Sequence, residues 1–436
     1  VLARASGLAA LLLLILPFRP PESLLSRQDG EREHGESHHE NPKAAFLIRL
    51  EWELEDMHAS QRRSLDAAAS LARGQVSSAA FGTQSETSIA VFGSNVVVGF
   101  NQVNGTQGSG VAYSTDGGIS FTDRGGLPTG GGTKRLFGDP SVTACSDGTF
   151  YYASVYSPDS LFSLSQVAVN VGTFSGPTLS WTNPLVAVSS PDDFLDKDWI
   201  TCDRTTNTLY VTYTRFVNGN VGSTTELRVE LIKSVDGGLH WSAPVVLDST
   251  TTESIHICIV ATGPNGEVYT IWERGLDDLA TATTQIEFRR SLNGGASFDP
   301  KVTVRTMAPS FFPAPVGFNR EDTIELGTLA VDLSNGPHRG NLYAVWVERE
   351  AAGGVKRDVF MATSTNQGGT WSAPVRVNDD PPGNDQVMPW VSVNGQGVIE
   401  PVWYDFRNWR GMHTADLYSA RSTDGGATFA SNYRIT

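Results

Sequence analysis

The sequence has little positive charge and few cysteines. Its 436 residues include 32 Lys and Arg against 47 Asp and Glu, which gives a formal net charge of −15. A nucleic-acid-binding protein needs a basic face to neutralise phosphates, so this balance argues against that class and predicts no nucleic-acid partner. Only three cysteines are present, which excludes a disulfide-rich scaffold. We interpret Cys145, Cys202 and Cys258 as small buried apolar side chains, at least one of them a free thiol.

The sequence also has no apolar run long enough to cross a membrane comfortably. Residues 8–18 are apolar and follow Arg4, but a transmembrane helix needs about 20 such residues. The run fits the apolar region of a secretory signal, although no clear cleavage site follows it. We therefore predict that residues 1–25 are a signal peptide or a membrane anchor. Either one predicts a secreted, periplasmic or cell-surface protein, and the anchor would make a membrane tether.

Two further segments precede the main part of the chain. Residues 26–43 are polar and charged and predict a disordered spacer. Residues 44–74 predict one helix that ends at Gly74, because apolar side chains recur there at three- and four-residue steps. The stripe consists of Leu47, Leu50, Leu54 and Met57.

One eight-residue pattern recurs five times after residue 75, with serine first, Asp or Asn third, glycines in the middle and Phe or Trp last. The copies occupy residues 114–121, 234–241, 291–298, 364–371 and 422–429. The Asp or Asn oxygen can accept backbone N–H groups of the turn, and glycines take positive φ without a Cβ penalty. The aromatic residue would fill the apolar space beneath the turn. The fourth copy has Gln367 before its glycine pair, which predicts a slightly wider turn.

The spacing of these turns predicts the architecture. The five serines are separated by 120, 57, 73 and 58 residues, so a degenerate copy is expected near residue 174, with Ser180 and Trp181 as its end. Six units of about 60 residues match the period of propeller blades. Each unit also has two strand-like runs before its turn, such as residues 199–202 and 209–213. Residues 75–436 therefore predict an all-β, six-bladed propeller with four-stranded antiparallel blades.

The repeated turn resembles the Asp-box, or bacterial neuraminidase repeat, of the sialidase superfamily. The resemblance covers about residues 80–436 and implies a propeller fold with the turns on the face away from any site. Sialidases use an arginine triad for the sugar carboxylate, a Tyr/Glu pair and an Asp acid. Their Phe/Tyr-Arg-Ile-Pro motif is absent ahead of Ser114 in this sequence.

Arginines recur at the ends of the second strands of four consecutive units. They are Arg215, Arg274, Arg349 and Arg407. Guanidinium groups bind carboxylates through two parallel hydrogen bonds, so these residues are candidates for binding an anionic ligand. Carboxylates accompany them, including Glu273 and Asp405, and Tyr404 lies beside Asp405. A ring of salt bridges between blades would explain the same pattern.

Further carboxylates occur where the innermost strands are expected to begin, at the end of the propeller away from the turns. Asp139 and Asp198 are candidate general acids there, if burial raises their pKa. They could equally cap turn amides. We expect no cofactor; the acidic run of Asp192, Asp193, Asp196 and Asp198 could hold Ca²⁺, although it lacks EF-hand spacing. His256 is interpreted as a core residue.

The resemblance implies an exported sialidase-like glycoside hydrolase that acts on anionic, sialic-acid-type glycans. Its candidate catalytic residues are Tyr404 with Asp405 or Glu273 as the nucleophile pair, and Asp198 or Asp139 as the acid. The four arginines would bind the substrate. Two alternatives stay open: a non-catalytic propeller that binds glycan or protein at the cell surface, and a lyase for uronic-acid polysaccharides. Arginines that pair with the protein's own carboxylates would count against the sialidase.

Overall fold

The computed structural model describes residues 76, 84–102, 108–159, 162–275, 283–307, 326–349, 356–408 and 414–436. All of them belong to one compact unit, residues 42–436. The predicted signal or anchor, spacer and helix lie outside the described residues. Within these ranges the regular structure consists of β-strands, and no helix is present. The described residues therefore contain no helix that could cross a membrane.

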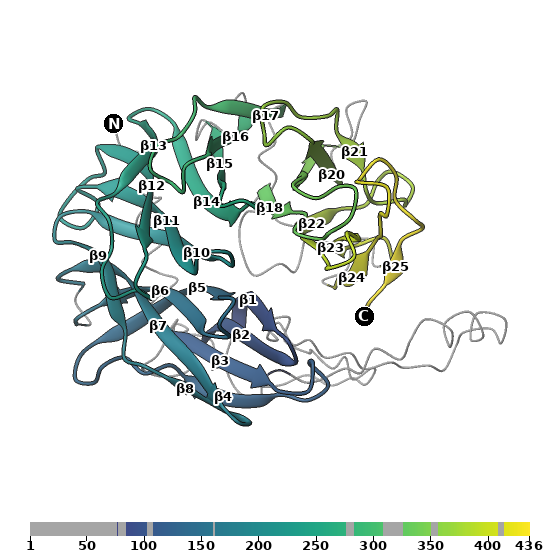
Figure 1. The fold of residues 1–436 in the computed structure, drawn as a ribbon. Helices are drawn as coiled ribbons and strands as arrows, with labels where there is room; N and C mark the ends of the chain where they lie inside the picture. The colour runs from purple at the N-terminus through teal and green to yellow at the C-terminus, as the bar shows by residue number, and fades with distance from the viewer. Residues whose placement is uncertain are drawn as a thin grey trace, which may run out of the picture. The chain divides into compact units, whose positions relative to one another are not determined.

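Six antiparallel sheets surround a common axis, and each is one blade (Figure 1). Blade 1 contains β1 (Gln84–Phe92), β2 (Asn95–Gln102), β3 (Ser109–Ser114) and β4 (Thr122–Gly126). Blade 2 contains β5 (Arg135–Ala144), β6 (Phe150–Ser157), β7 (Ser165–Ser175), β8 (Thr178–Trp181) and β9 (Leu185–Ser190). Blade 3 contains β10 (Phe194–Asp203), β11 (Thr208–Val217), β12 (Glu226–Ser234) and β13 (Val245–Thr250).

The remaining blades have the same order, from the innermost strand outwards. Blade 4 contains β14 (Ser254–Thr262), β15 (Val268–Gly275), β16 (Thr284–Ser291) and β17 (Val302–Met307). Blade 5 contains β18 (Leu326–Val331), β19 (Leu342–Arg349), β20 (Arg357–Ser364) and β21 (Val375–Arg376). Blade 6 contains β22 (Gln386–Val393), β23 (Ile399–Asp405), β24 (Asp416–Ser419) and β25 (Tyr433–Arg434). The six-bladed propeller predicted from the repeat spacing is confirmed.

The second strands are buried on both faces because neighbouring blades pack against each side. β6 is buried along its whole length, and so are the first seven residues of β11 and β19. Trp272, Trp346 and Trp403 are completely buried in the second strands of blades 4, 5 and 6. Burying one large apolar side chain is worth about 1.5–3 kcal/mol, so these residues hold neighbouring blades together.

The five recurring turns join the third and fourth strands of blades 1, 3, 4, 5 and 6, and we call them box turns. In the turn of blade 3, Ser234 Oγ accepts the N–H of Gly238 at 2.9 Å, and Asp236 Oδ1 accepts the N–H of His240 at 2.9 Å. The turn of blade 5 repeats both bonds with the same spacing, and Gln367 takes the positive φ (60°) that glycine has elsewhere. The expectation of a wider turn there was therefore wrong.

Blade 2 has a short hairpin, β7 to β8, where the sixth box turn was expected, and β9 then pairs with β7 as the outer strand. Trp181 ends β8 and still packs on the blade core, 6.1 Å from Tyr152 in an edge-on contact. Residues 180–181 thus lie where the sixth turn was expected. Of the box-turn features, only the aromatic ring that packs on the blade core is kept there.

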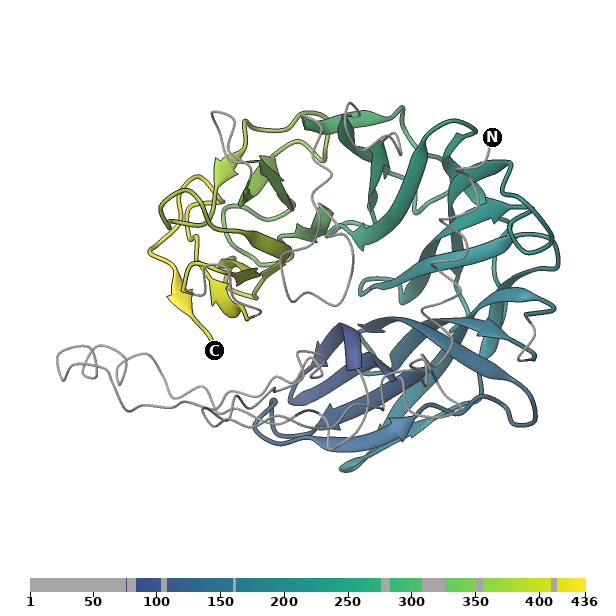
Figure 2. The same ribbon diagram turned by 180° about the vertical axis from the view of Figure 1, so that it is seen from behind.

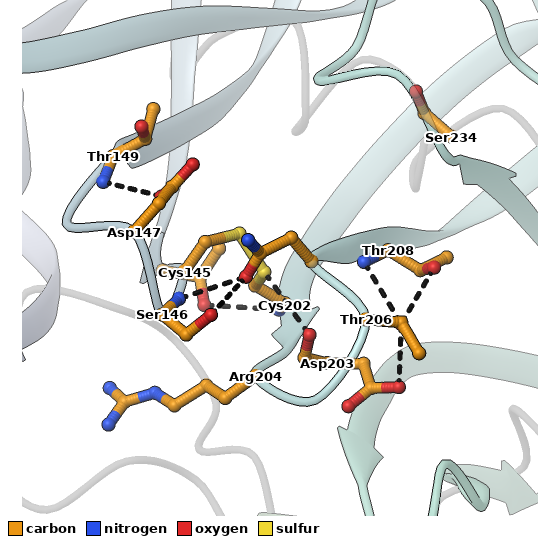
Figure 3. The surroundings of a disulfide bond; sticks show 12 residues. Cys145, Ser146, Asp147, Thr149, Cys202, Asp203, Arg204, Thr206, Thr208 and Ser234 are labelled. Carbon is orange, nitrogen blue, oxygen red and sulfur yellow. Dashed lines mark hydrogen bonds between the residues drawn. A yellow bond between two sulfur atoms is a disulfide. The ribbon is translucent and has the colours of Figure 1, made fainter.

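A disulfide between Cys145 and Cys202 corrects the interpretation of the cysteines as apolar side chains (Figure 3). Cys145 directly follows β5 and Cys202 lies near the end of β10, so the bond joins the innermost strands of blades 2 and 3 at the box-turn end. Ser146 reinforces the junction, because its hydroxyl donates to Asn207 Oδ1 at 2.7 Å. The separation of 57 residues is one blade period, which brings the two thiols side by side. Cys258 stays free and buried.

Candidate functional site

Every innermost strand is distorted near its start, at the end of the axis away from the box turns. The pairing register shifts there in β1, β5, β10, β14, β18 and β22. Five of these strands have a non-glycine residue with positive φ at the shift, namely Glu86, Asp139, Lys197, Ile257 and Met388. Such residues cost of order 1–3 kcal/mol, and bulges of this kind re-aim side chains next to functional sites. The strained bulges therefore make the end of the axis away from the box turns the candidate location of a functional site.

Charged side chains from blades 1 to 4 meet at these bulges, and we call them the axial cluster. It consists of Glu86, Asp139, Asp196, Lys197, Asp198 and His256. Lys197 joins three blades: its Nζ lies 3.0 Å from Glu86 Oε2 and 2.8 Å from Asp139 Oδ1. Its backbone N–H also donates to Asp139 Oδ2 at 3.1 Å, so both oxygens of Asp139 are fixed. With four carboxyl groups against one lysine, the cluster is acidic.

Asp198 is the most unusual member of the axial cluster. It is only 4% exposed, and neither carboxyl oxygen has a hydrogen-bond partner in the described part of the chain. Burial raises the pKa of Asp198 well above its ordinary value, and the charges of Asp139 and Asp196 raise it further. Burial therefore favours the protonated form of Asp198, next to the carboxylate of Asp139 that Lys197 holds. Two neighbouring carboxyl groups in different protonation states are the arrangement that acid–base catalysis needs.

His256 and Asp196 form the second half of the axial cluster. His256 Nδ1 lies 3.0 Å from Thr214 Oγ1 of blade 3, and its Nε2 lies 3.7 Å from Asp196 Oδ2. The histidine is therefore a bridge between blades 3 and 4, with about a quarter of its side chain exposed. Glu273 is its cross-strand partner on β15, so the structure brings this predicted residue close to the cluster.

An aromatic pair crosses the axis beside the axial cluster. Trp199 of β10 and Trp390 of β22 have ring centroids 5.2 Å apart, although blades 3 and 6 lie on opposite sides of the axis (Figures 1 and 2). Trp199 packs on the core between blades 3 and 4 and on the core between blades 4 and 5, whereas Trp390 is 36% exposed. Both residues stand two positions after a positive-φ residue, so the bulges set their direction.

Arg215, Arg274 and Arg407 lie outside this cluster and pair with carboxylates. Arg215 contacts Asp193 at 2.6 Å and Glu230 at 2.9 Å. Arg274 contacts Asp248 at 2.7 Å and also Glu253. Arg407 contacts Asp379 at 2.7 Å, Asp405 at 2.9 Å and Asp380 at 3.4 Å. Arg349 ends β19 and is exposed.

These ion pairs repeat around the propeller as trios of a buried aromatic residue, a carboxylate and an arginine. The trios are Tyr213–Glu230–Arg215, Trp272–Asp248–Arg274, Trp346–Glu348–Arg305 and Trp403–Asp405–Arg407. In each trio the aromatic O–H or N–H and the arginine both donate to the same carboxylate. Three blades use Trp where blade 3 uses Tyr213, so the Tyr213–Glu230 contact of 2.6 Å belongs to the structural repeat. The trios of Trp272 and Trp346 join neighbouring blades, and all four trios hold their guanidinium groups on carboxylates.

Asp405 also belongs to the interior of blade 6, next to the partly buried Tyr404. Asp405 is completely buried and accepts hydrogen bonds from Trp403, Arg407 and Gln386. Burial raises the pKa of Tyr404, which makes its phenolate harder to form. Among the predicted catalytic residues, Asp139 and Asp198 belong to the axial cluster and Glu273 lies opposite its His256, whereas Asp405 is held within blade 6.

Two other features do not coincide with the cluster. In the described ranges no group of three or more His, Cys, Asp or Glu side chains is arranged to hold a metal ion, and Asp193 of the acidic run pairs with Arg215. A pocket of about 220 Å³ lies between blades 4 and 5 at the box-turn end. Its charged lining is already paired, as Arg290 with Asp299 and Lys301 with Asp248.

No protein-family model matches the chain, and no curated protein matches it in sequence. Solved structures of glycan-active proteins are similar in fold. An ulvan lyase from a new family of polysaccharide lyases superposes with a TM-score of 0.50 at 12% identity, covering 79% of this chain and 82% of its own. The alpha-L-arabinofuranosidase of Fusarium graminearum gives 0.49 at 13% identity, with 78% and 93% covered. A Hadza microbial sialidase gives 0.45 at 15% identity, with 78% and 68% covered. At these identities the likeness shows the fold alone.

Sequence reasoning missed Lys197, Glu86 and the tryptophan pair. The signal for the tryptophans was present, because Trp199 and Trp390 occupy the same register of their repeat units. Lys197 and Glu86 had no comparable signal, since their contact spans 111 residues and depends on the bulges.

Proposed function

We propose that the chain is an exported glycoside hydrolase whose reacting groups are the carboxyls of the axial cluster. The observation that carries the proposal is Asp198, a buried carboxyl without a hydrogen-bond partner among the described residues, whose raised pKa favours the protonated form beside the anchored carboxylate of Asp139. Asp198 is the general acid that protonates the leaving oxygen, and Asp139 is the carboxylate that attacks or activates water. The bulge around residue 198 must open for the acid to reach the glycan, because both Asp198 oxygens are buried in this conformation.

A neutral glycan fits this site better than the anionic one implied by the sequence resemblance. The guanidinium groups of Arg215, Arg274 and Arg407 are held by carboxylates, and the axial cluster is acidic. An anionic sugar would therefore meet repulsion without the arginine clamp that sialidases use. The proposal of an exported protein is supported by the Cys145–Cys202 disulfide, because disulfides persist in oxidising compartments.

The test is hydrolysis of a panel of fluorogenic glycosides by the full chain. The panel contains an arabinofuranoside, a xyloside, a glucoside, a galactoside, a mannoside and a sialoside. We expect release from a neutral member, its loss in Asp198→Asn and Asp139→Asn, and unchanged release in Asp299→Asn. Asp299 is a matched control because it is a paired carboxylate at the box-turn end.

Other outcomes would redirect the interpretation. Release from the sialoside alone would restore the sialidase interpretation. Eliminative cleavage of a uronic-acid polymer, which produces an unsaturated product, would favour the lyase. Absence of any turnover would leave a glycan-binding propeller, in which Lys197 only joins the carboxylates of Glu86 and Asp139.

A further inference from the structure

We infer that Trp390 and Trp199 form a platform on which the apolar face of a neutral sugar ring stacks. The inference rests on the proposed function, because it assigns the ligand class of the same site. Trp390 is 36% exposed, and none of the six apolar clusters formed by described residues includes it. Its recorded ring contact is with Trp199. The exposed part of the Trp390 side chain is thus left for a ligand.

Comparison among the blades shows that the fold does not require tryptophan at this position. The residue two places after the positive-φ residue is Ser88 in blade 1, Ser141 in blade 2 and Ile259 in blade 4. Ser88 and Ser141 serve the fold, because their hydroxyls accept backbone N–H groups of the next blade at 2.9 Å. Ile259 is 2% exposed and belongs to the core. Of these five blades, blades 3 and 6 alone place a large aromatic ring there, and these two blades face each other across the axis.

The chemistry around the pair matches a sugar. Trp199 directly follows Asp198, so the platform and the axial cluster share the bulged start of β10. A sugar ring has an apolar C–H face that packs on an aromatic ring, and hydroxyl groups that donate to carboxylates. An apolar surface with a few convergent polar groups is the usual composition of a small-ligand site. The acidity of the cluster selects a ring without a carboxylate.

A purely structural role makes a different prediction for the same residues. A pair that only joins blades 3 and 6 across the axis needs apolar bulk, and leucine would supply it. A platform needs a flat ring, which phenylalanine keeps and leucine lacks. The variants Trp390→Phe and Trp390→Leu therefore separate the two roles, and the thermal melting temperature reports on the fold of each.

The experiment is a calorimetric titration of the full chain with xylohexaose, arabinohexaose, mannohexaose and cellohexaose at millimolar concentration. 3′-Sialyllactose is titrated in the same way as the anionic comparison. We expect at least one neutral hexasaccharide to bind. Its affinity should fall about tenfold in Trp390→Leu and by less in Trp390→Phe. Trp371→Phe is the matched control, since Trp371 belongs to a box turn and other copies have Phe there.

Equal affinity of wild type and Trp390→Leu would overturn the inference, and so would the absence of binding by every neutral probe. Binding of sialyllactose alone would overturn it as well. The proposed hydrolase fails separately: binding that depends on Trp390 without turnover keeps the platform and rejects the enzyme. Turnover that is unaffected by Trp390→Leu keeps the enzyme and rejects the platform.

Discussion

Replacing Arg407 with alanine removes the cation from the trio of blade 6. Asp405 is completely buried, and only 14% of the Arg407 side chain is exposed. Removing one partner of a buried ion pair leaves an uncompensated charge and costs about 3–5 kcal/mol. Asp405 keeps the indole N–H of Trp403 at 2.7 Å, so we expect the lower end, about 3 kcal/mol. This loss would be structural, in contrast to the substrate-binding role that the sequence suggested for Arg407.

Urea denaturation measures the loss as a lower transition midpoint with an unchanged slope. The control is Arg421→Ala, because Arg421 pairs with Glu400 at 3.3 Å but is 53% exposed. An exposed pair contributes at most about 1 kcal/mol, so this variant should be close to wild type. The reasoning is refuted if Arg407→Ala has wild-type stability while its affinity for a sialoside falls. That result would make the guanidinium a ligand-binding group.

Three further predictions concern stability. Replacing Cys145 and Cys202 together with serine opens a loop closed over 57 residues, which should cost about 4 kcal/mol in urea denaturation; a cost below about 1 kcal/mol would contradict the account. Ser234→Ala removes the buried acceptor of the Gly238 N–H and should cost about 1–3 kcal/mol without changing turnover, since the box turn is remote from the axial cluster. Folding raises the pKa of Asp198, so above roughly pH 4 the folded state binds more protons than the unfolded chain. The contribution of Asp198 to the free energy of unfolding should therefore fall as pH rises. Urea midpoints between pH 5 and 8 should therefore depend less on pH in Asp198→Asn, and an identical dependence would show that the carboxyl is already ionised.

The fold could be predicted because its determinants are local. Each box turn is encoded within eight residues, and the spacing of five copies is enough to count six blades. The strand ends that carry Arg215, Arg274 and Arg407 could also be read from sequence, because they share one register.

The partners of those arginines could not be read in the same way. Glu230 reaches Arg215 from the third strand, and Asp248 reaches Arg274 from the neighbouring blade, so each pairing depends on packing between strands. In blade 5 the trio uses Arg305 of β17 instead of the predicted Arg349. A repeat pattern predicts where an arginine side chain lies, but only the packed structure shows whether a carboxylate of the protein already pairs with it.

The candidate site illustrates the same limit. Asp139 and Asp198 were accessible to sequence reasoning because they stand where innermost strands begin. The raised pKa of Asp198 follows from its burial in the bulge near two other carboxyls, which no local sequence pattern shows. Lys197 and the Trp199–Trp390 contact likewise depend on blades that are distant in the chain.

The most direct measurement compares hydrolysis of the neutral fluorogenic glycosides by wild type and by Asp198→Asn, with the urea midpoint of both proteins at pH 8. If the buried acid serves catalysis and destabilises the fold, Asp198→Asn should lower turnover without lowering stability. Turnover should be lost in Asp198→Asn, while its midpoint is no lower than that of wild type. Undiminished turnover in this variant would contradict the assignment of the axial cluster as the catalytic site.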